Sequence, residues 1–296
     1  MKLNAAIEEF ILEQRVRGNS SATVSYYRNI LAYFKEFAGN VEISDITLQL
    51  CRKYYLYLAE DDINSVSVQS YVRGLRAFLR WLYEDEKIEE NICAKFKLPK
   101  ATRKVIDILT EEEIKLVFDS IRGEDLHVSR NRLILALMLD CGLRLHEVVT
   151  LTVSSVHLRD RYIIVQQGKG DKQRVVPFGN FTHRLIERYL KLSSDMLPRE
   201  ALIIKVSGFE IYEPITDTTI KQLFRKLKNR TGIQRLKPHL LRHTFATRYL
   251  ENGGNIYSLQ AILGHTSLEM VKRYLHLANS RIRKDFSKFS PLDNLG

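Results

Sequence analysis

Apolar residues recur along the first part of the chain at the spacing that is typical of amphipathic helices. Within residues 22–37 they lie three or four positions apart and so share one helix face; they are Val24, Tyr27, Ile30, Leu31 and Phe34. The same periodicity predicts helices over residues 3–17, 47–60 and 67–83. We therefore expect residues 1–90 to form a small bundle of about four or five helices.

The chain from residue 107 onward mixes helical periodicity with short β-rich runs. Residues 162–167 and 173–178 are β-rich and flank a turn with two glycines, which predicts a β-hairpin. Residues 202–206 are a candidate third strand. Helical periodicity predicts the remaining elements at residues 111–121, 128–141, 180–194 and 216–230. The predicted fold class is mainly α, with a small β-sheet or hairpin in the C-terminal domain.

The segment between these two regions differs from both. Pro99 interrupts any helix. Five cations lie close together here, namely Lys95, Lys97, Lys100, Arg103 and Lys104. Such a segment is either a flexible tether or a stretch of chain that tracks along the phosphates of a nucleic acid. The sequence therefore predicts a helical domain at residues 1–90, a basic linker at residues 91–106 and a second domain at residues 107–296.

The chain as a whole is basic. Lysine and arginine outnumber aspartate and glutamate by 46 to 35, which gives a formal net charge of +11 and a pI near 9.5. A balance of this kind favours a polyanionic partner, of which nucleic acid is the commonest. The alternative interpretation is a basic enzyme with a well-solvated surface.

The sequence contains neither a predicted membrane span nor a predicted secretory signal. No apolar run approaches the roughly 18–20 residues that cross a bilayer. The N-terminal segment carries three glutamates among its apolar residues, which is typical of an amphipathic helix and not of a signal peptide. Cys51, Cys93 and Cys141 are odd in number and far apart, so they indicate no disulfide framework and no zinc site. We expect a cytoplasmic protein.

The helix predicted at residues 67–83 carries a basic stripe. Arg73, Arg76 and Arg80 are three and four residues apart and so share one face. A lone stripe is usually a solvated surface, whereas in a chain this basic it is equally consistent with a helix in a DNA groove. The candidates for DNA contact are these three arginines with Lys97, Lys100, Arg103 and Lys172.

Polar side chains occur at suggestive intervals near the C-terminal end. His239 and Arg242 share a helix face, His265 follows a helix-ending glycine, and Tyr274 lies in a further amphipathic run. Each alone has an ordinary explanation, such as a helix cap for His265 and core packing for Tyr274. His239 and His243 have a spacing that can bind zinc, but neither an intervening acid nor a third ligand is evident.

Two further candidates precede these residues in the chain. Arg144 stands at a predicted helix start, where an ion pair with Glu147 would explain it. Lys169 and Lys172 lie at the hairpin tip, where solvated lysines are common. The surrounding glycines lack the spacing of an ATPase phosphate loop, and no G-x-S-x-G elbow of a serine hydrolase is present. We predict no metal, ATP or other cofactor.

Taken together, these residues resemble the signature of the tyrosine recombinase (phage integrase) family, Arg…Lys…His-x-x-Arg…His…Tyr. The matching residues are Arg144, Lys169, His239, Arg242, His265 and Tyr274. Their contexts read GLR at 142–144, GKG at 168–170, HLLRHT at 239–244, LGH at 263–265 and YLH at 274–276. The resemblance covers nearly the whole chain, whose layout is most similar to Xer-type recombinases and the integrases of bacterial mobile elements. Cys141 and His146 depart from the threonine and serine that the family often carries.

The resemblance implies a two-domain DNA clamp, in which a helical SAM-like core-binding domain precedes a catalytic domain with a C-terminal docking tail. Arg144 and Arg242 would hold the phosphate, and His265 would hydrogen-bond one of its oxygens. Tyr274 would be the nucleophile, with His239 as its base. The remaining roles would fall to Glu147, which supports Arg144 or His239, and to Lys169, the general acid, with Lys172 as the alternative. His243 has no place in the signature.

The resemblance also implies the partners and the outcome of the reaction. The expected partner is a double-stranded DNA target site, and the expected assembly is a homotetramer on DNA, alone or with a second recombinase or accessory protein. Strands would exchange through a 3′-phosphotyrosyl intermediate and a Holliday junction. A type IB topoisomerase-like enzyme and a non-catalytic DNA-binding regulator are the alternatives. The sequence leaves open whether the role is Xer-type dimer resolution or mobile-element integration and excision.

Overall fold

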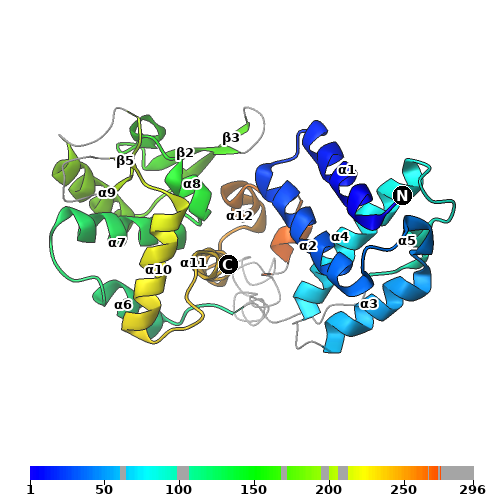
Figure 1. Ribbon diagram of the computed structural model, residues 1–296. Helices are drawn as coiled ribbons and strands as arrows, with labels where there is room; N and C mark the ends of the chain where they lie inside the picture. Colours follow the sequence, from blue (N-terminus) through cyan, green and yellow to red (C-terminus); the bar gives the residue numbers. More distant parts are fainter. Residues whose placement is uncertain are drawn as a thin grey trace, which may run out of the picture. The chain divides into compact units, whose positions relative to one another are not determined.

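The structure is a computed structural model of the 296-residue chain (Figure 1). It describes residues 1–60, 65–98, 107–167, 172–194, 200–205, 213–265, 267–272 and 274. The chain divides into two compact units, residues 1–104 and 105–296, and each is described by itself. Among the described residues, no helix combines the length and the apolar character that a membrane span requires.

The first unit is the predicted helical bundle. Its elements are α1 (Leu3–Val16), α2 (Ser21–Ala38), η1 (Ile43–Asp45), α3 (Leu48–Glu60), α4 (Ser65–Glu84) and α5 (Ile92–Lys95). The predicted helices are therefore confirmed, with boundaries that differ by up to two residues. The start of α2 is fixed by the hydroxyl of Ser20, which accepts a hydrogen bond from the Thr23 N–H at 3.2 Å. Its end coincides with Gly39, whose φ of 74° continues no helix.

Helix α4 lies at the centre of this bundle and contacts α1, α2, α3 and α5 (Figure 1). An aromatic cluster fills the space between α1, α2 and α4. The ring of Phe10 lies 5.2 Å from Tyr27, 5.5 Å from Phe78 and 5.4 Å from Trp81, measured between centroids. The first two of these contacts are edge-on, which is a favoured geometry for aromatic pairs.

The first unit extends beyond the boundary that we predicted at residue 90. Ile92, Cys93 and Phe96 are buried in the same core as α1–α4. The Arg76 guanidinium donates a hydrogen bond to the Phe96 carbonyl, which ties α5 to α4. Residues 91–96, which the sequence predicted as the start of the basic linker, therefore pack with the bundle.

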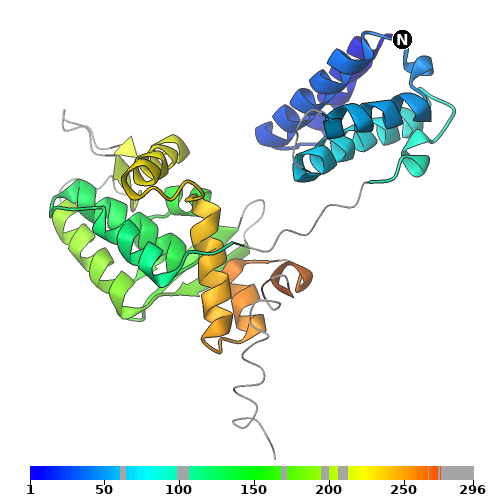
Figure 2. The same ribbon diagram turned by 90° about the horizontal axis from the view of Figure 1, so that it is seen from below.

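The second unit surrounds a small sheet with helices. Its elements are α6 (Glu111–Asp119), α7 (Leu126–Leu139), α8 (Leu145–Val149), η2 (Val153–Ser155), β1 (Val156–His157), β2 (Tyr162–Gln167), β3 (Lys172–Pro177), α9 (Asn180–Ser193), β4 (Ile204–Lys205), β5 (Glu213–Pro214), α10 (Asp217–Thr231), α11 (Pro238–Glu251) and α12 (Ile256–Leu263). Helices α7 and α9 pack side by side, and α11 also contacts α7 (Figure 2). The predicted fold class is confirmed.

Strands β2 and β3 form the predicted hairpin, and β1 adds a third antiparallel strand at the side of β2. The register pairs Ile163 with Val176 and Val165 with Arg174, and all four side chains are buried. The candidate strand at 202–206 is represented by β4, which pairs with β5 in a separate two-stranded sheet. Strand β1 was missed because two residues are too few to show an alternating pattern.

The second unit has a main core and a satellite core. In α7, residues 133–138 are all apolar and buried, so this part of the helix runs through the main core. The satellite core contains Tyr274 and five other residues, and Phe245 and Tyr249 pack against both cores. Its other members are Ala246, Leu250, Leu259, Leu263 and Val271. The end of α11, α12 and the segment that carries Tyr274 thus form one packed module.

We predict that Phe10→Ala destabilises the first unit by about 3–5 kcal/mol, because it removes an aromatic ring that is 2% exposed. The matched control is Leu12→Ala on the same helix, where the side chain is 59% exposed and the change should stay within about 0.5 kcal/mol. Trp81, the one tryptophan of the chain, lies in this core, so its fluorescence in urea measures this unit. Equal losses in both variants would contradict the packing described.

Candidate active site

The loop before α8 brings Arg144 to a fixed place. Gly142 has a φ of 64°, and a Cβ at this position would collide with the ring of Phe245, so glycine is required twice over. The Arg144 N–H donates to Glu147 Oε2 at 2.8 Å, and its Nη1 donates to Glu147 Oε1 at 2.8 Å. The Arg144 side chain is still 36% exposed. A guanidinium that is fixed through one terminal nitrogen and is still partly open to solvent is suited to an anionic ligand.

Arg242 lies deeper than Arg144 and joins three segments of the chain. It projects from α11 and donates to the carbonyl of Gly142 and, at 2.7 Å, to the carbonyl of Leu263. Its Nη2 also lies 3.2 Å from Nε2 of His265. Burial, with the nearby charge of Arg144, lowers the pKa of Arg242 to about 10. The side chain therefore remains charged at neutral pH while it fixes the positions of the Gly142 loop and the end of α12.

The turn after α12 places His265 beside Arg242. Gly264 has a φ of 63° and ends the helix in the left-handed conformation. The N–H of Gly264 donates to the Ala261 carbonyl, and the N–H of His265 donates to the Gln260 carbonyl, each at 3.1 Å. This pair of bonds is a Schellman motif. The His265 imidazole is thus presented by a defined helix ending and not by an irregular loop.

His239 stands near the start of α11, among cations. Burial lowers its pKa, and so do the charges of Arg242, Lys237 and Arg144, in that order. The lowered pKa keeps the imidazole neutral at neutral pH, with a lone pair that can accept a proton. His239, Arg144 and His265 therefore all lie near Arg242.

Tyr274 meets a residue to which the sequence assigned no role. Its side chain is 2% exposed, and its hydroxyl lies 2.8 Å from Nδ1 of His243. His243 follows His239 by one helical turn, and the two rings lie 6.5 Å apart between centroids. In the sequence, the i, i+4 spacing of the two histidines indicates only a possible zinc pair. The same spacing also puts His243 next to the group of signature residues, which is the signal that could have identified it.

Arg174 is the second residue that the sequence analysis missed. It lies on β3 and donates from Nη1 and Nη2 to the two carboxylate oxygens of Glu147, at 2.9 and 2.7 Å. Its Nε donates to the Ile262 carbonyl at 2.7 Å. The alternation in β3 buries Arg174 and Val176 and exposes Gln173 and Val175, so the inward position was readable from the pattern.

The pKa of Glu147 shows how strong this arrangement is. Burial raises the pKa, but the hydrogen bonds and charge of Arg174, with the hydrogen bonds of Arg144, outweigh burial and hold it at about 2. Arg242 Nη1 lies 3.9 Å from the same carboxylate. Glu147 is therefore an ionised group shared by three guanidiniums, which come from the loop before α8, from β3 and from α11.

Two models of known families match the chain. The model described as the phage integrase family matches residues 107–281, and the model described as the phage integrase SAM-like domain matches residues 2–98. The chain belongs to the phage integrase family. It is a tyrosine recombinase, and the SAM-like match agrees with the predicted helical core-binding domain.

Curated relatives support this membership over the full length of the recombinase. The chain is 29% identical over 295 residues to tyrosine recombinase XerD of Halalkalibacterium halodurans, with 98% of both chains covered. It is 30% identical over 281 residues to tyrosine recombinase XerC of Staphylococcus saprophyticus, with 92% of both chains covered.

Solved structures show the same fold. The crystal structure of XerA recombinase is 27% identical to the recombinase, with a TM-score of 0.53 over 97% of this chain and 99% of that chain. A lambda integrase dimer bound to a COC′ core site is 19% identical, with a TM-score of 0.75 over 93% of this chain and 95% of that chain. The second likeness concerns the fold alone.

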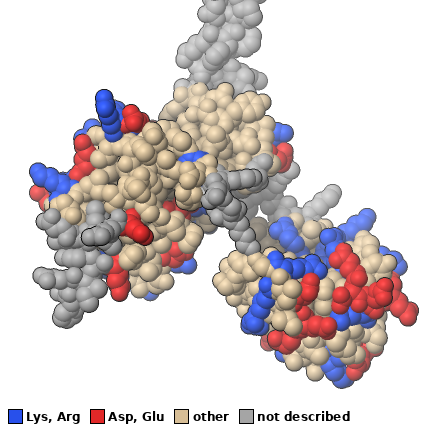
Figure 3. Space-filling view, turned by 90° about the horizontal axis from the view of Figure 1, so that it is seen from above, with Lys and Arg blue, Asp and Glu red and all other residues tan. Residues whose placement is uncertain are grey.

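The remaining candidates are placed only in part. Lys169, Lys100 and Arg103 lie outside the described residues, and Lys172 begins β3 with its side chain outside them. Arg73, Arg80 and Lys97 are exposed. Arg76 is half-buried and bonded to Phe96, so the predicted stripe is not a row of three equivalent arginines. The face of the first unit in Figure 3 mixes basic and acidic side chains, so it does not single out a DNA-binding surface.

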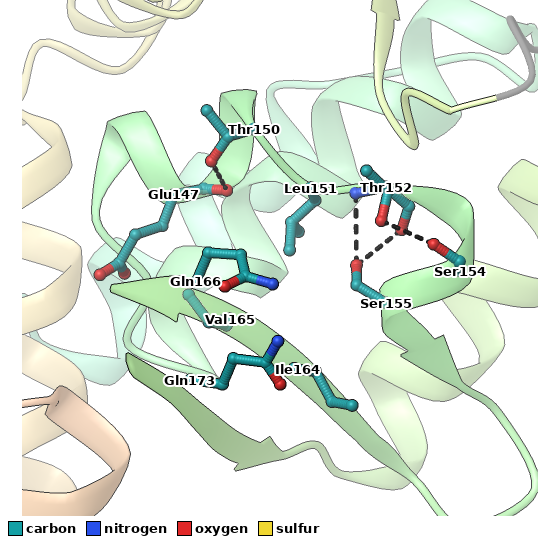
Figure 4. A pocket seen from close by; sticks show the side chains of 10 residues that line it. All are labelled: Glu147, Thr150, Leu151, Thr152, Ser154, Ser155, Ile164, Val165, Gln166 and Gln173. Atoms are coloured by element: carbon teal, nitrogen blue, oxygen red, sulfur yellow. Dashed lines mark hydrogen bonds between the residues drawn. The ribbon is translucent and has the colours of Figure 1, made fainter. Parts of the chain in front are cut away.

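A pocket of about 280 Å³ is lined by Glu147 together with residues of η2, β2 and β3 (Figure 4). The side chains of Gln166 and Gln173 extend toward it, whereas the Glu147 carboxylate points away from it. Its hydroxyl groups bond locally; for example, Thr150 Oγ1 donates to the carbonyl of Glu147 at 3.3 Å. This pocket is therefore separate from the group of signature residues.

We predict that Arg174→Met destabilises the second unit by about 3 kcal/mol. Removing one partner of a buried ion pair costs about 3–5 kcal/mol, and Arg144 still bonds Glu147 in the variant, which favours the lower end. Gln173→Met, at an exposed position of the same strand, is the control and should change stability by less than about 0.5 kcal/mol. Urea unfolding followed by circular dichroism measures both, with Trp81 fluorescence identifying the transition of the first unit.

The pH dependence of this loss provides a check on its cause. The pKa of Glu147 is lowered from 4.5 to about 2 in the folded protein. The group therefore contributes stability above about pH 4.5 that is lost as the pH falls toward 2. The difference between the wild type and Arg174→Met should shrink across that window. A difference that grows there would show that the pair with Glu147 is not the source.

Proposed function

We propose that the recombinase cleaves and rejoins DNA at specific sites through a covalent bond between Tyr274 and a 3′-phosphate. The observation that carries this proposal is the convergence of two guanidiniums on one carboxylate. Arg144 and Arg242 lie 2.8 and 3.9 Å from Glu147, with His265 at 3.2 Å from Arg242. This is the arrangement that a phosphodiester needs, because its non-bridging oxygens must be held while charge develops on them.

The arginines would act as an electrostatic clamp on the phosphate. Guanidinium groups bind phosphate oxygens through paired hydrogen bonds that lysine cannot reproduce. Loss of one such donor should remove about 3–4 kcal/mol of transition-state stabilisation, as for other oxyanion donors. Arg144, which reaches solvent, would approach the phosphate directly. Arg242 would complete the clamp and also hold His265 and the loop at Gly142 in place.

The tyrosine needs help to become a nucleophile. A free phenol has a pKa near ~10, so forming the phenolate at neutral pH costs about 4 kcal/mol. The positive field of the arginines and a nearby base would offset this cost. By resemblance the base is His239, whose lowered pKa keeps it neutral, and Lys169 would donate a proton to the leaving 5′ oxygen. A 5′-hydroxyl from another duplex would then attack the 3′-phosphotyrosyl bond and restore the strand.

The proposed partners are double-stranded DNA target sites in the cytoplasm. A formal net charge of +11 favours phosphate contact, and the exposed residues Arg73, Arg80 and Lys97 are candidates for it. Lambda integrase, which shares the fold, is a dimer on its core site. We propose a homotetramer on DNA that exchanges strands through a Holliday junction, alone or with a second recombinase or an accessory protein.

We predict that Tyr274→Phe binds target DNA as the wild type does but forms no covalent adduct. The change removes one oxygen from a side chain that is otherwise packed in the satellite core. A nicked suicide duplex traps the adduct, and a denaturing gel detects it. Adduct from the variant would contradict the assignment of the nucleophile.

If the wild type relaxes plasmids without target sites and exchanges no strands, the topoisomerase-like alternative would replace recombination.

The roles of Lys169 and Lys172 can be separated by the reaction step that each variant affects. We predict that Lys169→Ala slows strand cleavage by about 10²-fold or more, as expected for loss of a general acid. Lys172→Ala should mainly weaken DNA binding. Single-turnover cleavage at saturating protein measures the first effect and a salt titration of binding measures the second. A cleavage defect confined to Lys172→Ala would assign the acid to that residue.

A further inference from the structure

The hydroxyl of Tyr274 is hydrogen-bonded to an imidazole outside the family signature. Nδ1 of His243 lies 2.8 Å from Tyr274 Oη, and the ring centroids are 5.7 Å apart. Tyr274 belongs to the satellite core, and His243 lies on α11, the helix that supplies Ala246 and Leu250 to that core. The tyrosine ring is 2% exposed, so bulk water has little access to it. A proton that leaves this hydroxyl therefore has a protein nitrogen as its nearest described acceptor.

The two histidines of α11 face different surroundings. His239 is surrounded by the positive charges of Arg242, Lys237 and Arg144. Its ring centroid is 6.5 Å from that of His243, so one helical turn separates the two imidazoles. His239 thus lies with the residues that would hold the phosphate, whereas His243 contacts the proposed nucleophile, Tyr274. This division differs from the assignment by resemblance to the family, in which His239 is the base for Tyr274.

We propose that His243 is a catalytic residue that accepts the Tyr274 proton during strand cleavage. The inference rests on the proposed function, because it assumes that Tyr274 attacks a phosphodiester. In the step, a lone pair of Tyr274 Oη forms the bond to phosphorus while the proton of Oη moves to Nδ1 of His243. The bond from phosphorus to the 5′ oxygen breaks, and that oxygen takes a proton from the general acid.

The same geometry serves the reverse step. His243 must carry its hydrogen on Nε2 before cleavage, which leaves the Nδ1 lone pair directed at Tyr274. After cleavage His243 is an imidazolium beside the phosphotyrosyl oxygen. During rejoining it returns the proton to that oxygen as the tyrosine leaves, while the attacking 5′-hydroxyl gives its own proton back to the deprotonated general acid. One residue thus acts as base in one direction and as acid in the other. His239 then serves to bind the phosphate.

The test compares matched variants of the two histidines in the full-length protein. In His243→Asn the amide keeps a hydrogen-bonding group near the position of Nδ1 but cannot take a proton. We expect single-turnover cleavage of a nicked suicide duplex to slow by about 10²-fold or more, with DNA binding unchanged. His239→Asn should also slow cleavage. Replacing Tyr274 by difluorotyrosine, whose phenol is more acidic, should restore most of the rate in His243→Asn and little of it in His239→Asn.

Two results would overturn the proposal. Cleavage by His243→Asn at the wild-type rate or faster would show that the hydrogen bond only holds the tyrosine at rest. Rescue by difluorotyrosine in His239→Asn, and not in His243→Asn, would assign the base to His239. If His243→Asn fails to fold by circular dichroism, His243→Gln replaces it with the same expectations.

The proposed function is tested separately by the unmodified protein. A wild type that forms no adduct on the suicide duplex would contradict the proposed function itself. A wild type that forms the adduct, together with unimpaired His243 variants, would contradict only the role of His243.

Discussion

The ion pairs between the buried Glu147 carboxylate and the surrounding arginines are the interaction on which the second unit depends. Glu147 accepts both guanidinium bonds of Arg174, accepts two bonds from Arg144 and lies 3.9 Å from Arg242. Guanidiniums at such distances repel one another, and the repulsion is stronger away from water. The carboxylate offsets that repulsion and fixes their directions. With a pKa of about 2 it stays ionised at every pH at which the protein would work.

The arrangement leaves positive charge in excess. Three guanidiniums face one carboxylate, so the site is arranged for an anion before one binds, and little reorganisation is needed when charge develops on a phosphate. Helix α11 then connects this anion site to the nucleophile, because Arg242 and His243 are neighbours in sequence but point to different partners. Arg242 bonds the loop at Gly142 and the end of α12, whereas His243 bonds Tyr274.

The sequence predicted the parts that depend on local pattern. Helical periodicity and capping residues gave most helices, and the ordered signature gave the group around Arg144 and Arg242. It did not predict interactions that exist only after folding. The buried Arg174 bonds a carboxylate 27 positions away and a carbonyl 88 positions away, and the contact of His243 with Tyr274 spans 31 positions. Short strands such as β1, and the helix α5 within a basic segment, carry too few residues for periodicity to show.

The proposal that Tyr274 bonds covalently to a 3′-phosphate is best tested by identifying the bond between protein and DNA chemically. Wild-type protein trapped on a nicked suicide duplex can be digested with trypsin, and the peptide that carries the nucleotide can be sequenced by mass spectrometry. We expect a 3′-phosphate attached to the peptide that contains Tyr274, with a free 5′-hydroxyl on the released strand. A nucleotide on any other peptide, or a linkage through a 5′-phosphate, would contradict it.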